Sequence, residues 1–393
     1  MLGLTTHLNV SEILDWDRVA SVGGLYSSVT WLKQCETPTT RYLVVRDDQE
    51  AVAVMPCTVA TAPGDLPPST DLYCLFGNRD VPSPELAAQL YPHVSCGTVR
   101  GYSNRLLVVE GLDRDRRASV IRKLLEGARE FARAESAKLI SFGYLPPSDI
   151  AELRAIDDTL LPVFAESEAV LERVTSFDEF LGQMNHKHRN TIQREMHGFT
   201  ANGMRHERRR LMDVFEPLCE LVTIHERKFD PTETVEANRH HFQQYITAGL
   251  DPWTHVHCVY QGATLVALCV AITYGSTAYL RVSAAAPDAP KKAYLYFNVV
   301  FYEPARTAAG LHEIHYGLKS LEGKVLRGAS LRPLWFLLDW LTPIDANLDA
   351  QLVAAGERRF ATDVELLSRY RDEVTVREQL DLERARALLG DRR

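Results

Sequence analysis

The chain has 393 residues, of which 46% are hydrophobic and 24% are charged, and its formal net charge is −8 at pH 7. This composition is that of a globular protein long enough for two domains, and it excludes a fibrous or disordered chain. The negative net charge also excludes a protein that is basic throughout, so any polyanion must be bound by a local cationic patch.

The cysteines and the N-terminus indicate the compartment. The seven cysteines are scattered without a C-x-x-C pair, so we expect reduced, buried thiols in a cytoplasmic protein. The first residues lack a basic stretch followed by an apolar run, so they predict no signal peptide. No window holds the roughly 20 apolar residues that span a bilayer, and we expect no membrane insertion.

The first half of the chain alternates between apolar runs and turn-rich segments. Helical spacing of Val10, Ile13, Leu14, Val19 and Leu32 predicts an early helix. An acidic stretch over residues 149–165 is expected to be an exposed connection between the two halves. The patterns predict a helical region, a hairpin, a loop, a strand, an amphipathic helix and a strand over residues 9–34, 41–60, 61–84, 105–109, 118–134 and 137–142.

The second half opens on a highly charged segment and continues into a β-meander. Turn signals at Gln261-Gly262 and Gly275-Ser276 divide the meander into three strands. Pro304 falls inside a later helix and is expected to kink it. The predicted elements are helices over 177–199, 211–229 and 235–248, strands over 253–283, a helix over 294–309, a strand over 312–316, and helices over 345–355, 364–370 and 374–393.

A cationic segment stands out in this acidic chain. Lys187, Arg189 and Arg194 lie on one predicted helix, and Arg205 and the run 208–210 follow it. One interpretation is a solvated face paired with Glu195, Glu207 and their neighbours. The other is a surface that binds phosphates of a tRNA acceptor stem or of coenzyme A, to which Lys291 and Lys292 at a later helix start are also suited.

A second group of polar residues follows the strand at 312–316. Gly317 breaks that strand, and a loop with Lys319 leads to the spacing Lys324-x-x-Arg327-Gly328. A cationic loop directly after a strand is a common way to build a site at strand ends. We therefore expect the candidate site at this position.

Two ordered motifs give the second half a family resemblance. Residues 177–181, FDEFL, followed by the basic stretch 187–194, and the box 323–328, GKVLRG, resemble those of the Fem-type aminoacyl-tRNA-dependent transferases, a doubled branch of the GNAT acyltransferase superfamily. Gly323 and Arg327 stand where Fem enzymes have aromatic residues, which brings the chain nearer to BioF2-like relatives. The resemblance covers about 220 C-terminal residues, and the first half only by its order of elements.

The resemblance implies an α/β (α+β) protein of two tandem GNAT-like domains, each a mixed, mostly antiparallel sheet flanked by helices. We expect a degenerate domain over 1–168 and a domain over 169–393 that carries the active site. The resemblance implies Lys324 as the electrostatic catalyst, with Lys319 and Arg327 as second choices. The sequence identifies no general base, and Glu303 and His315 are the candidates. Residues expected to contact substrate are Arg281, Tyr302, Tyr316, Lys319 and Arg327, and those expected to bind phosphate are Lys187, Arg189, Arg194, Lys291 and Lys292.

The expected reaction is acyl transfer that forms an amide bond, with an aminoacyl group moving from aminoacyl-tRNA to an amine acceptor such as a cell-wall precursor or natural-product intermediate. Residues 284–293, AAAPDAPKKA, lack the glycine-rich pyrophosphate loop of acetyl-CoA users, which favours tRNA as donor. An acyl-CoA-dependent N-acyltransferase and a non-catalytic binding module remain alternatives. The spacing of the histidines predicts no metal site, and no resident cofactor is expected.

Overall fold

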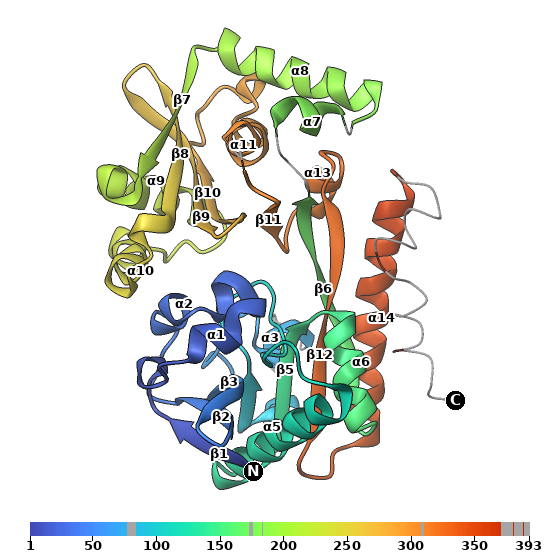
Figure 1. Cartoon of the computed structure of the whole chain (residues 1–393). Helices are drawn as coiled ribbons and strands as arrows, with labels where there is room; N and C mark the ends of the chain where they lie inside the picture. Colours follow the sequence, from blue (N-terminus) through green and yellow to red (C-terminus); the bar gives the residue numbers. More distant parts are fainter. Residues whose placement is uncertain are drawn as a thin grey trace. The chain divides into compact units, whose positions relative to one another are not determined.

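The computed structural model describes residues 1–76, 84–172, 176–182, 184–307, 310–370, Leu380 and Leu388. Residue contacts divide the chain into two compact units, the first made of Met1–Glu168 with Arg332–Arg393 and the second of Ala169–Leu331 (Figure 1). In the described part of the chain, no helix is both long enough and apolar enough to cross a membrane.

The first unit combines a sheet with several short helices and two long ones. Its strands are β1 (Leu2–His7), β2 (Thr40–Asp47), β3 (Glu50–Ala60), β4 (His93–Cys96), β5 (Leu139–Leu145), most of β6 (Leu161–Glu172) and most of β12 (Ser330–Trp340). Its helices are η1 (Val10–Glu12), α1 (Trp16–Ala20), η2 (Ser21–Ser27), α2 (Val29–Lys33), α3 (Leu72–Phe76), α4 (Pro84–Leu90), α5 (Arg114–Ala134), α6 (Pro147–Ile156) and α14 (Ala346–Ser368).

The sheet of the first unit is mixed. The strand order is β1-β2-β3-β4-β5-β12-β6, in which β4 pairs in parallel with β5, whereas β1–β2, β2–β3, β3–β4 and β5–β12 are antiparallel. Helix α5 connects those parallel strands. Its N-cap residue Asp113 accepts a hydrogen bond from Arg116 N at 2.9 Å. Its apolar face is buried against the sheet, as the amphipathic pattern predicts.

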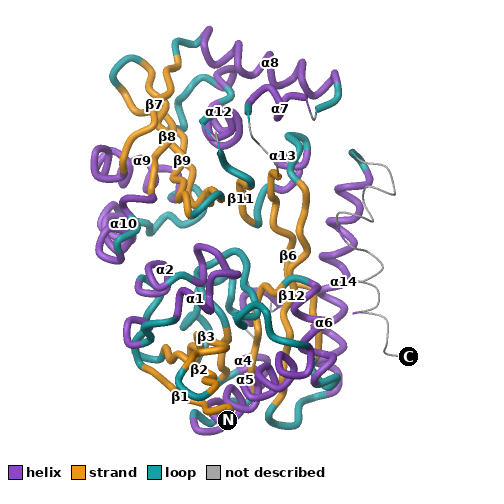
Figure 2. The backbone as a smooth tube through the Cα atoms, viewed as in Figure 1, coloured by secondary structure: helices purple, strands orange, loops and turns teal. Residues whose placement is uncertain are grey.

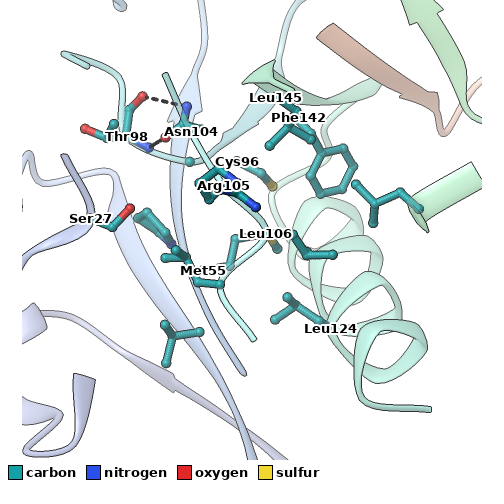
Figure 3. Close-up of a pocket in the computed structure, with 15 residues that line it drawn as sticks. Ser27, Met55, Cys96, Thr98, Asn104, Arg105, Leu106, Leu124, Phe142 and Leu145 are labelled. Carbon is teal, nitrogen blue, oxygen red and sulfur yellow. Dashed lines mark hydrogen bonds between the residues drawn. The ribbon is translucent and has the colours of Figure 1, made fainter. Parts of the chain in front are cut away.

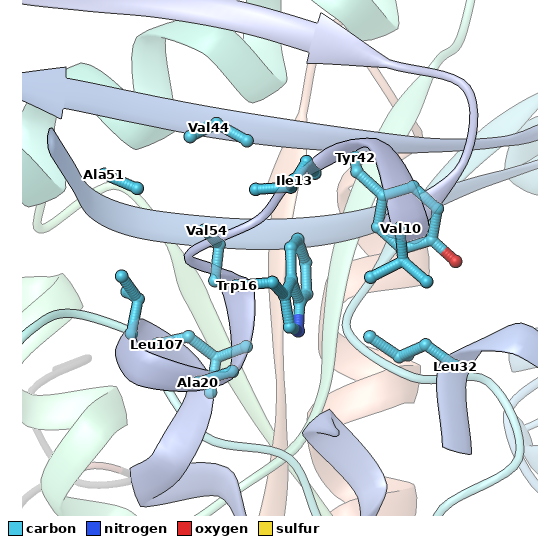
Figure 4. Close-up of a cluster of buried hydrophobic side chains, with 11 residues drawn as sticks. Val10, Ile13, Trp16, Ala20, Leu32, Tyr42, Val44, Ala51, Val54 and Leu107 are labelled. Atoms are coloured by element: carbon cyan, nitrogen blue, oxygen red, sulfur yellow. The ribbon is translucent and has the colours of Figure 1, made fainter. Parts of the chain in front are cut away.

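A core cluster surrounds Trp16, which is fully buried (Figure 4). Its indole stands edge-on to Tyr42 at 5.2 Å between ring centroids, and its Nε1 donates to Ser27 O at 2.8 Å. The expected single helix over 9–34 is replaced by four short segments. Ser28 interrupts any continuous helix, because its backbone is extended and its side chain caps the start of α2 by accepting a hydrogen bond from Trp31 N. Leu14, expected in the apolar face, is 99% exposed.

Other parts of the first unit also differ from the sequence prediction. Residues 105–109, expected to be a strand, form only one isolated bridge, at Val108. The strand that precedes α5 in the sheet is β4 instead. Residues 149–165, expected as an exposed connection, fall in α6 and β6 instead. Helix α3 lies within the expected loop 61–84, whose residues 77–83 fall outside the description. The predicted helix over 374–393 also lies almost wholly outside the described residues.

Residues after Leu331 belong to the first unit, whereas the expected division gave them to the second. Trp335 of β12 and Phe360 of α14 both pack edge-on against Phe164 of β6, at 5.4 and 5.1 Å between ring centroids. β12 also pairs with β5 from Trp335 to Trp340. These apolar contacts place the C-terminal segment in the first unit, and the second unit begins after Glu168.

The parallel strands β4 and β5 separate after Cys96 and Phe142, and the chain that follows β4 fills the space between them. Asn104 N donates to Tyr144 O at 2.9 Å, and the Asn104 side chain donates to Gly143 O at 2.9 Å. The same side chain accepts a hydrogen bond from Thr98 N (Figure 3). The cavity left around this segment measures about 20 Å³, which is room for about one water molecule.

His93 of β4 makes the stability of the first unit dependent on pH. It is fully buried, and neither ring nitrogen has a hydrogen-bond partner among the described residues. Burial lowers its pKa from 6.5 to about 4. Between these pH values the unfolded chain binds a proton that the folded chain does not, so the free energy of unfolding falls as the pH falls.

We expect His93→Leu to reduce the loss of unfolding free energy between pH 7 and pH 4 by about 3 kcal/mol, at roughly 1.4 kcal/mol per pKa unit. Urea unfolding at both pH values measures this difference. His240→Leu, which replaces an exposed histidine of the second unit, is the control and should leave the loss unchanged. Equal losses in the wild type and His93→Leu would contradict the assignment.

The second unit is a sheet with helices on both faces (Figure 2). Its strands, besides the ends of β6 and β12, are β7 (Met204–Arg210), β8 (Thr254–Gln261), β9 (Thr264–Tyr274), β10 (Thr277–Ala285) and β11 (Glu313–Gly317). Its helices are α7 (Phe177–Gly182), α8 (His186–Ala201), η3 (Leu211–Val214), α9 (Phe215–Glu226), α10 (Val235–Ala248), η4 (Asp251–Trp253), η5 (Lys291–Ala293), α11 (Leu295–Phe297), the π-helix η6 (Asn298–Tyr302), α12 (Glu303–Arg306) and α13 (Leu321–Val325).

The strand order of the second unit is β6-β11-β10-β9-β8-β7, and the expected meander is confirmed as β8, β9 and β10. Helices α9 and α10 cover one face, and α8 with the segment α11–η6–α12 covers the other (Figure 1). A π-helical turn precedes Pro304 at the position where a kink was expected. The charged run 204–210 is the edge strand β7, which was not predicted as a strand.

Candidate functional site

The central feature of the second unit is the divergence of β10 and β11. These parallel strands pair only from Thr277–Glu313 to Tyr279–His315. Beyond that point β10 carries a bulge at Arg281 and continues along β9. The ends of β10 and β11 therefore part, and side chains from the neighbouring helices approach the free end of β11.

Lys324 is held at the end of β11. Its Nζ atom donates to Tyr316 O at 2.6 Å and to Gly317 O at 3.0 Å, and the residue is 4% exposed. The short helix α13 supplies the lysine and ends at Val325. Gly328 lies in the turn that follows, with a φ of +87°, and its added Cβ would lie 2.4 Å from Met184 Cε. The spacing Lys-x-x-Arg-Gly thus encodes a short helix, the glycine turn that follows it and a buried cation.

Tyr316 lies beside this cation. Its ring packs on Phe301 at 4.8 Å, and its buried hydroxyl has no hydrogen-bond partner among the described residues. Burial raises the pKa of the hydroxyl, which therefore stays protonated and able to donate. The structure thus brings together Lys324 and Tyr316, two of the expected site residues.

Arg327 is engaged inside the protein. Its Nη2 atom lies 2.9 and 2.8 Å from the two carboxylate oxygens of Glu195 on α8, and Nε donates to Tyr302 Oη at 2.9 Å. Nη1 donates to Gly323 O at 2.9 Å, and the guanidinium lies 3.4 Å from the centroid of the Phe297 ring. Because all its nitrogen atoms are used here, Arg327 holds α8, η6 and α13 together, and Tyr302 shares this role.

The other residues expected at the site are more dispersed. The ring of His315 stacks on Tyr279 at 4.8 Å, and its Nε2 lies 3.0 Å from Glu313 Oε2. Arg281 occupies the bulge of β10, and Lys319 is exposed in the turn after β11.

Glu303, expected as a base near Lys324, faces another part of the sheet. Phe301 packs on Tyr316, but Glu303 lies two residues further along the helix, and its Oε2 is 3.1 Å from Nδ1 of His206 on β7. His206 Nε2 in turn lies 3.1 Å from Nδ1 of His257 on β8. Sequence reasoning missed His206, because only the pairing of β7 with β8 brings it beside His257.

Helix α8 presents the expected cations to solvent. Lys187 and Arg194 are exposed and Arg189 is partly exposed, and within the described residues none of the three forms an ion pair. The acids expected to neutralise them are used elsewhere, since Glu195 pairs with Arg327 and Glu207 pairs with Arg205 and Arg209.

Lys291 and Lys292 lie close to the same helix. Segment η5 packs on α8 at Gly198, where an added Cβ would lie 2.4 Å from Lys292 O. Glycine at this position therefore permits the close approach of the two backbones. Both lysines are exposed, and with Lys187, Arg189 and Arg194 they make up the cationic surface of α8 and η5, in which Lys187 and Arg194 share a helix face and Arg189, two positions from Lys187, lies on another.

The turn between β10 and α11 uses its own backbone donors. Ala286 N donates to Val266 O, and the N–H groups of Ala289, Ala293 and Tyr294 donate to carbonyls within the turn. Pro287 and Pro290 have no N–H.

Over the described residues, no group of three or more histidine, cysteine or acidic side chains is arranged to hold a metal ion.

Comparisons with known proteins agree with this architecture. The FemAB-like family, described as peptidoglycan biosynthesis/recognition, matches residues 88–334, which is more than half of the chain. No curated protein matches the sequence.

Among solved structures the chain is similar to FemX, at 13% identity and a TM-score of 0.56, over 85% of this chain and 96% of that one. It is also similar to L-PGS from Bacillus licheniformis, at 10% identity and a TM-score of 0.53, over 90% and 97% of the two chains. A conserved protein of unknown function from Bacteroides thetaiotaomicron matches at 13% identity and a TM-score of 0.53, over 86% and 100%.

These structural similarities concern the fold, and the family match concerns the sequence itself. The expected fold class, an α/β protein with tandem GNAT-like folds, is confirmed. The chain belongs to the FemAB-like family and is a Fem-type acyltransferase of the GNAT fold.

Proposed function

We propose that this protein transfers an aminoacyl group from aminoacyl-tRNA to the amine of an acceptor and so forms an amide bond. The observation that carries the proposal is the cationic surface of α8 and η5, whose α8 members have no ion-pair partner in the described structure. Lysine and arginine left without acidic partners on one surface are what the attraction of a nucleic-acid backbone requires.

The distribution of charge supports the same donor. Residues 169–331 contain 18 lysines and arginines and 17 aspartates and glutamates, whereas the whole chain carries a net charge of −8. The acidic excess therefore lies in the first unit. The second unit is close to neutral, so it lacks the acidic excess that would repel a polyanion from the protein as a whole.

The turn between β10 and α11 argues against coenzyme A as the donor. A pyrophosphate is commonly held by a row of backbone N–H groups at a helix N-terminus. Here four N–H groups of the turn are already used, and two positions are proline. The two prolines therefore interrupt any continuous row of N–H groups along this turn.

The chemistry needs no covalent intermediate on the enzyme. The amine nitrogen attacks the carbonyl carbon of the aminoacyl ester, the bond to the ribose oxygen breaks, and the proton of the amine is lost to solvent while the ribose oxygen is protonated. We assign to Lys324 the stabilisation of negative charge on the carbonyl oxygen. Tyr316, with its protonated hydroxyl, is assigned to the same subsite, and Arg281 and Lys319 to contacts with the acceptor.

The first unit is proposed to be a degenerate, structural copy of the fold. Its parallel strands β4 and β5 diverge as β10 and β11 do, but Asn104 and its neighbours fill the space that results. A cavity of about 20 Å³ leaves no room for a substrate. Transfer is therefore placed in the second unit.

The family description bears on the acceptor, and the proposed donor bears on the compartment. The family description favours a cell-wall precursor as the amine acceptor, with a natural-product intermediate as the alternative. Aminoacyl-tRNA is a cytoplasmic substrate, so the proposed function carries a cytoplasmic location with it.

A charge-removal experiment tests the role of α8. We expect the combined substitutions Lys187→Gln, Arg189→Gln and Arg194→Gln to weaken binding of aminoacyl-tRNA and to lower the slope of log K against log salt by about 1 for each residue. Titrations between about 50 and 200 mM salt measure this slope.

The matched control is the combination Arg114→Gln, Arg122→Gln and Arg133→Gln, which removes three exposed arginines from α5 in the first unit. It changes the net charge by the same amount and should leave the slope near its wild-type value. Equal slopes for the two triple variants would refute the role of α8 in binding tRNA.

A further inference from the structure

A second cavity lies in the second unit, apart from Lys324 and Tyr316. It has a volume of about 490 Å³ and is bounded by α8, β7 and the segment η6–α12. This volume lies within the usual range of small-molecule sites, about 300–1,000 Å³. Its residue Glu303 lies two positions from Phe301, the residue that packs on Tyr316, so the same helix separates the cavity from the proposed transfer site.

The charges in this cavity form a balanced pair. Glu303 and Arg306 both line it, and the Arg306 Nη1 atom lies 3.3 Å from Glu303 Oε1. The Glu303 side chain is 9% exposed and that of Arg306 is 45% exposed. A long contact to a half-exposed arginine is a weak ion pair, which a ligand can open at little cost.

Two histidines fix the carboxylate in place. Burial, with the neighbouring His206 and Arg208, lowers the pKa of His257 to about 3, so its ring is neutral near pH 7. His206 links His257 to Glu303, since its Nε2 lies 3.1 Å from His257 Nδ1 and its Nδ1 lies 3.1 Å from Glu303 Oε2. The His206 contact occupies Oε2 of Glu303, and its Oε1 atom remains for the Arg306 contact or a ligand.

The opposite part of the lining is apolar. Met196 and Phe199 of α8 and Met204 of β7 also line the cavity. Methionine side chains adapt to ligands of different shape, and a phenylalanine ring offers a flat apolar surface. The cavity thus combines Glu303 and Arg306 with an apolar patch, and His197, Thr200, His206 and Asn298 complete its lining.

This combination selects the charge of a ligand. A ligand with a single charge would pair with one member of the Glu303–Arg306 pair and leave the other without that partner, at a larger cost for Glu303, which is 9% exposed, than for Arg306, which is 45% exposed. A zwitterion replaces both halves of the pair at once and leaves no charge uncompensated. The apolar patch accommodates an uncharged side chain.

We infer that this cavity binds a free α-amino acid with an apolar side chain, its ammonium group on Glu303 and its carboxylate on Arg306. His206 is a positioning residue that orients the Glu303 carboxylate. The inference goes beyond the proposed acyl transfer and does not rest on it, because it depends only on the cavity and its own charges.

Binding of L-leucine to the full chain, measured by calorimetry, tests this inference. Leucinamide keeps only the ammonium group and 4-methylpentanoate keeps only the carboxylate, so each should bind at least tenfold more weakly than leucine. Equal affinities for the three compounds, or no binding of leucine, methionine or phenylalanine at millimolar concentration, would overturn the inference.

Two variants connect the binding to the named residues. Glu303→Gln should reduce the affinity for leucine to that of 4-methylpentanoate, and Arg306→Met should reduce it to that of leucinamide. Arg306 is half-exposed, so its variant is expected to fold even if Glu303→Gln does not. Leucine binding that survives both substitutions would contradict the assignment.

The control uses another i,i+3 ion pair on a helix. Arg239 Nη1 and Glu236 Oε2 on α10 lie 3.0 Å apart, and Glu236→Gln and Arg239→Met should leave leucine binding unchanged. Lys324→Met should also keep leucine binding, so failure of the proposed transfer reaction and failure of this inference have different results.

Discussion

Lys324→Met is expected to lower the turnover number of aminoacyl transfer by about 100-fold while KM changes little. In the structure the lysine ammonium is buried and held by Tyr316 O and Gly317 O at the end of β11. A fixed cation in a buried site stabilises charge that develops in the transition state without having to reorient. Methionine keeps much of the side-chain length but removes the charge.

A single-turnover assay with labelled aminoacyl-tRNA and hydroxylamine as a minimal amine acceptor measures this effect. Thermal unfolding of the same variant separates it from a loss of structure, because two carbonyls lose their donor at a cost of about 1–3 kcal/mol each. Lys138→Met is the control, since Lys138 also donates to a backbone carbonyl but lies in the first unit. A folded Lys324→Met protein with wild-type turnover would exclude the assigned role.

Breaking the Glu195–Arg327 pair should have the largest effect on stability. The two side chains are 5% and 6% exposed, and Tyr302 and Phe297 enclose the guanidinium. Removal of one partner leaves a buried charge uncompensated, so we expect Glu195→Gln and Arg327→Met each to cost about 3–5 kcal/mol of unfolding free energy. Urea unfolding measures both values.

The double variant Glu195→Leu with Arg327→Met should recover much of this loss, because neither buried charge then remains. The exposed pair Glu216–Arg239, at 2.8 Å, supplies the comparison, and Glu216→Gln should cost less than about 1 kcal/mol. Additive losses in the Glu195 and Arg327 double variant would show that the two residues do not act as a pair.

Local patterns predicted the elements whose burial is regular. The hairpin of β2 and β3, the amphipathic helix α5 and the meander from β8 to β10 follow apolar periods that the sequence displays directly. Strand β7 was missed because it lies at the edge of the sheet. Its sequence, MRHERRR, shows the charge of an exposed edge instead of an apolar strand pattern.

The residues of the candidate site also differ in how far the sequence predicts them. Lys324 could be singled out as a candidate because its short helix, the following Gly328 and the preceding strand are contiguous in sequence, and its catalytic role stays a prediction. The partner of Arg327 was not, because Glu195 is 132 positions away and reads as part of a charged helix. His206 and Glu303 likewise meet only when β7 and α12 are brought together by the fold. Sequence therefore indicates the local cation, and the structure supplies the long-range partners.

The identity of the donor is the central claim of this account, and a parallel binding titration with aminoacyl-tRNA and coenzyme A tests it most directly. The proposed function predicts that aminoacyl-tRNA binds with an affinity that falls steeply with salt and that coenzyme A does not bind. Micromolar binding of coenzyme A without binding of tRNA would contradict it and identify the protein as an acyl-CoA-dependent transferase.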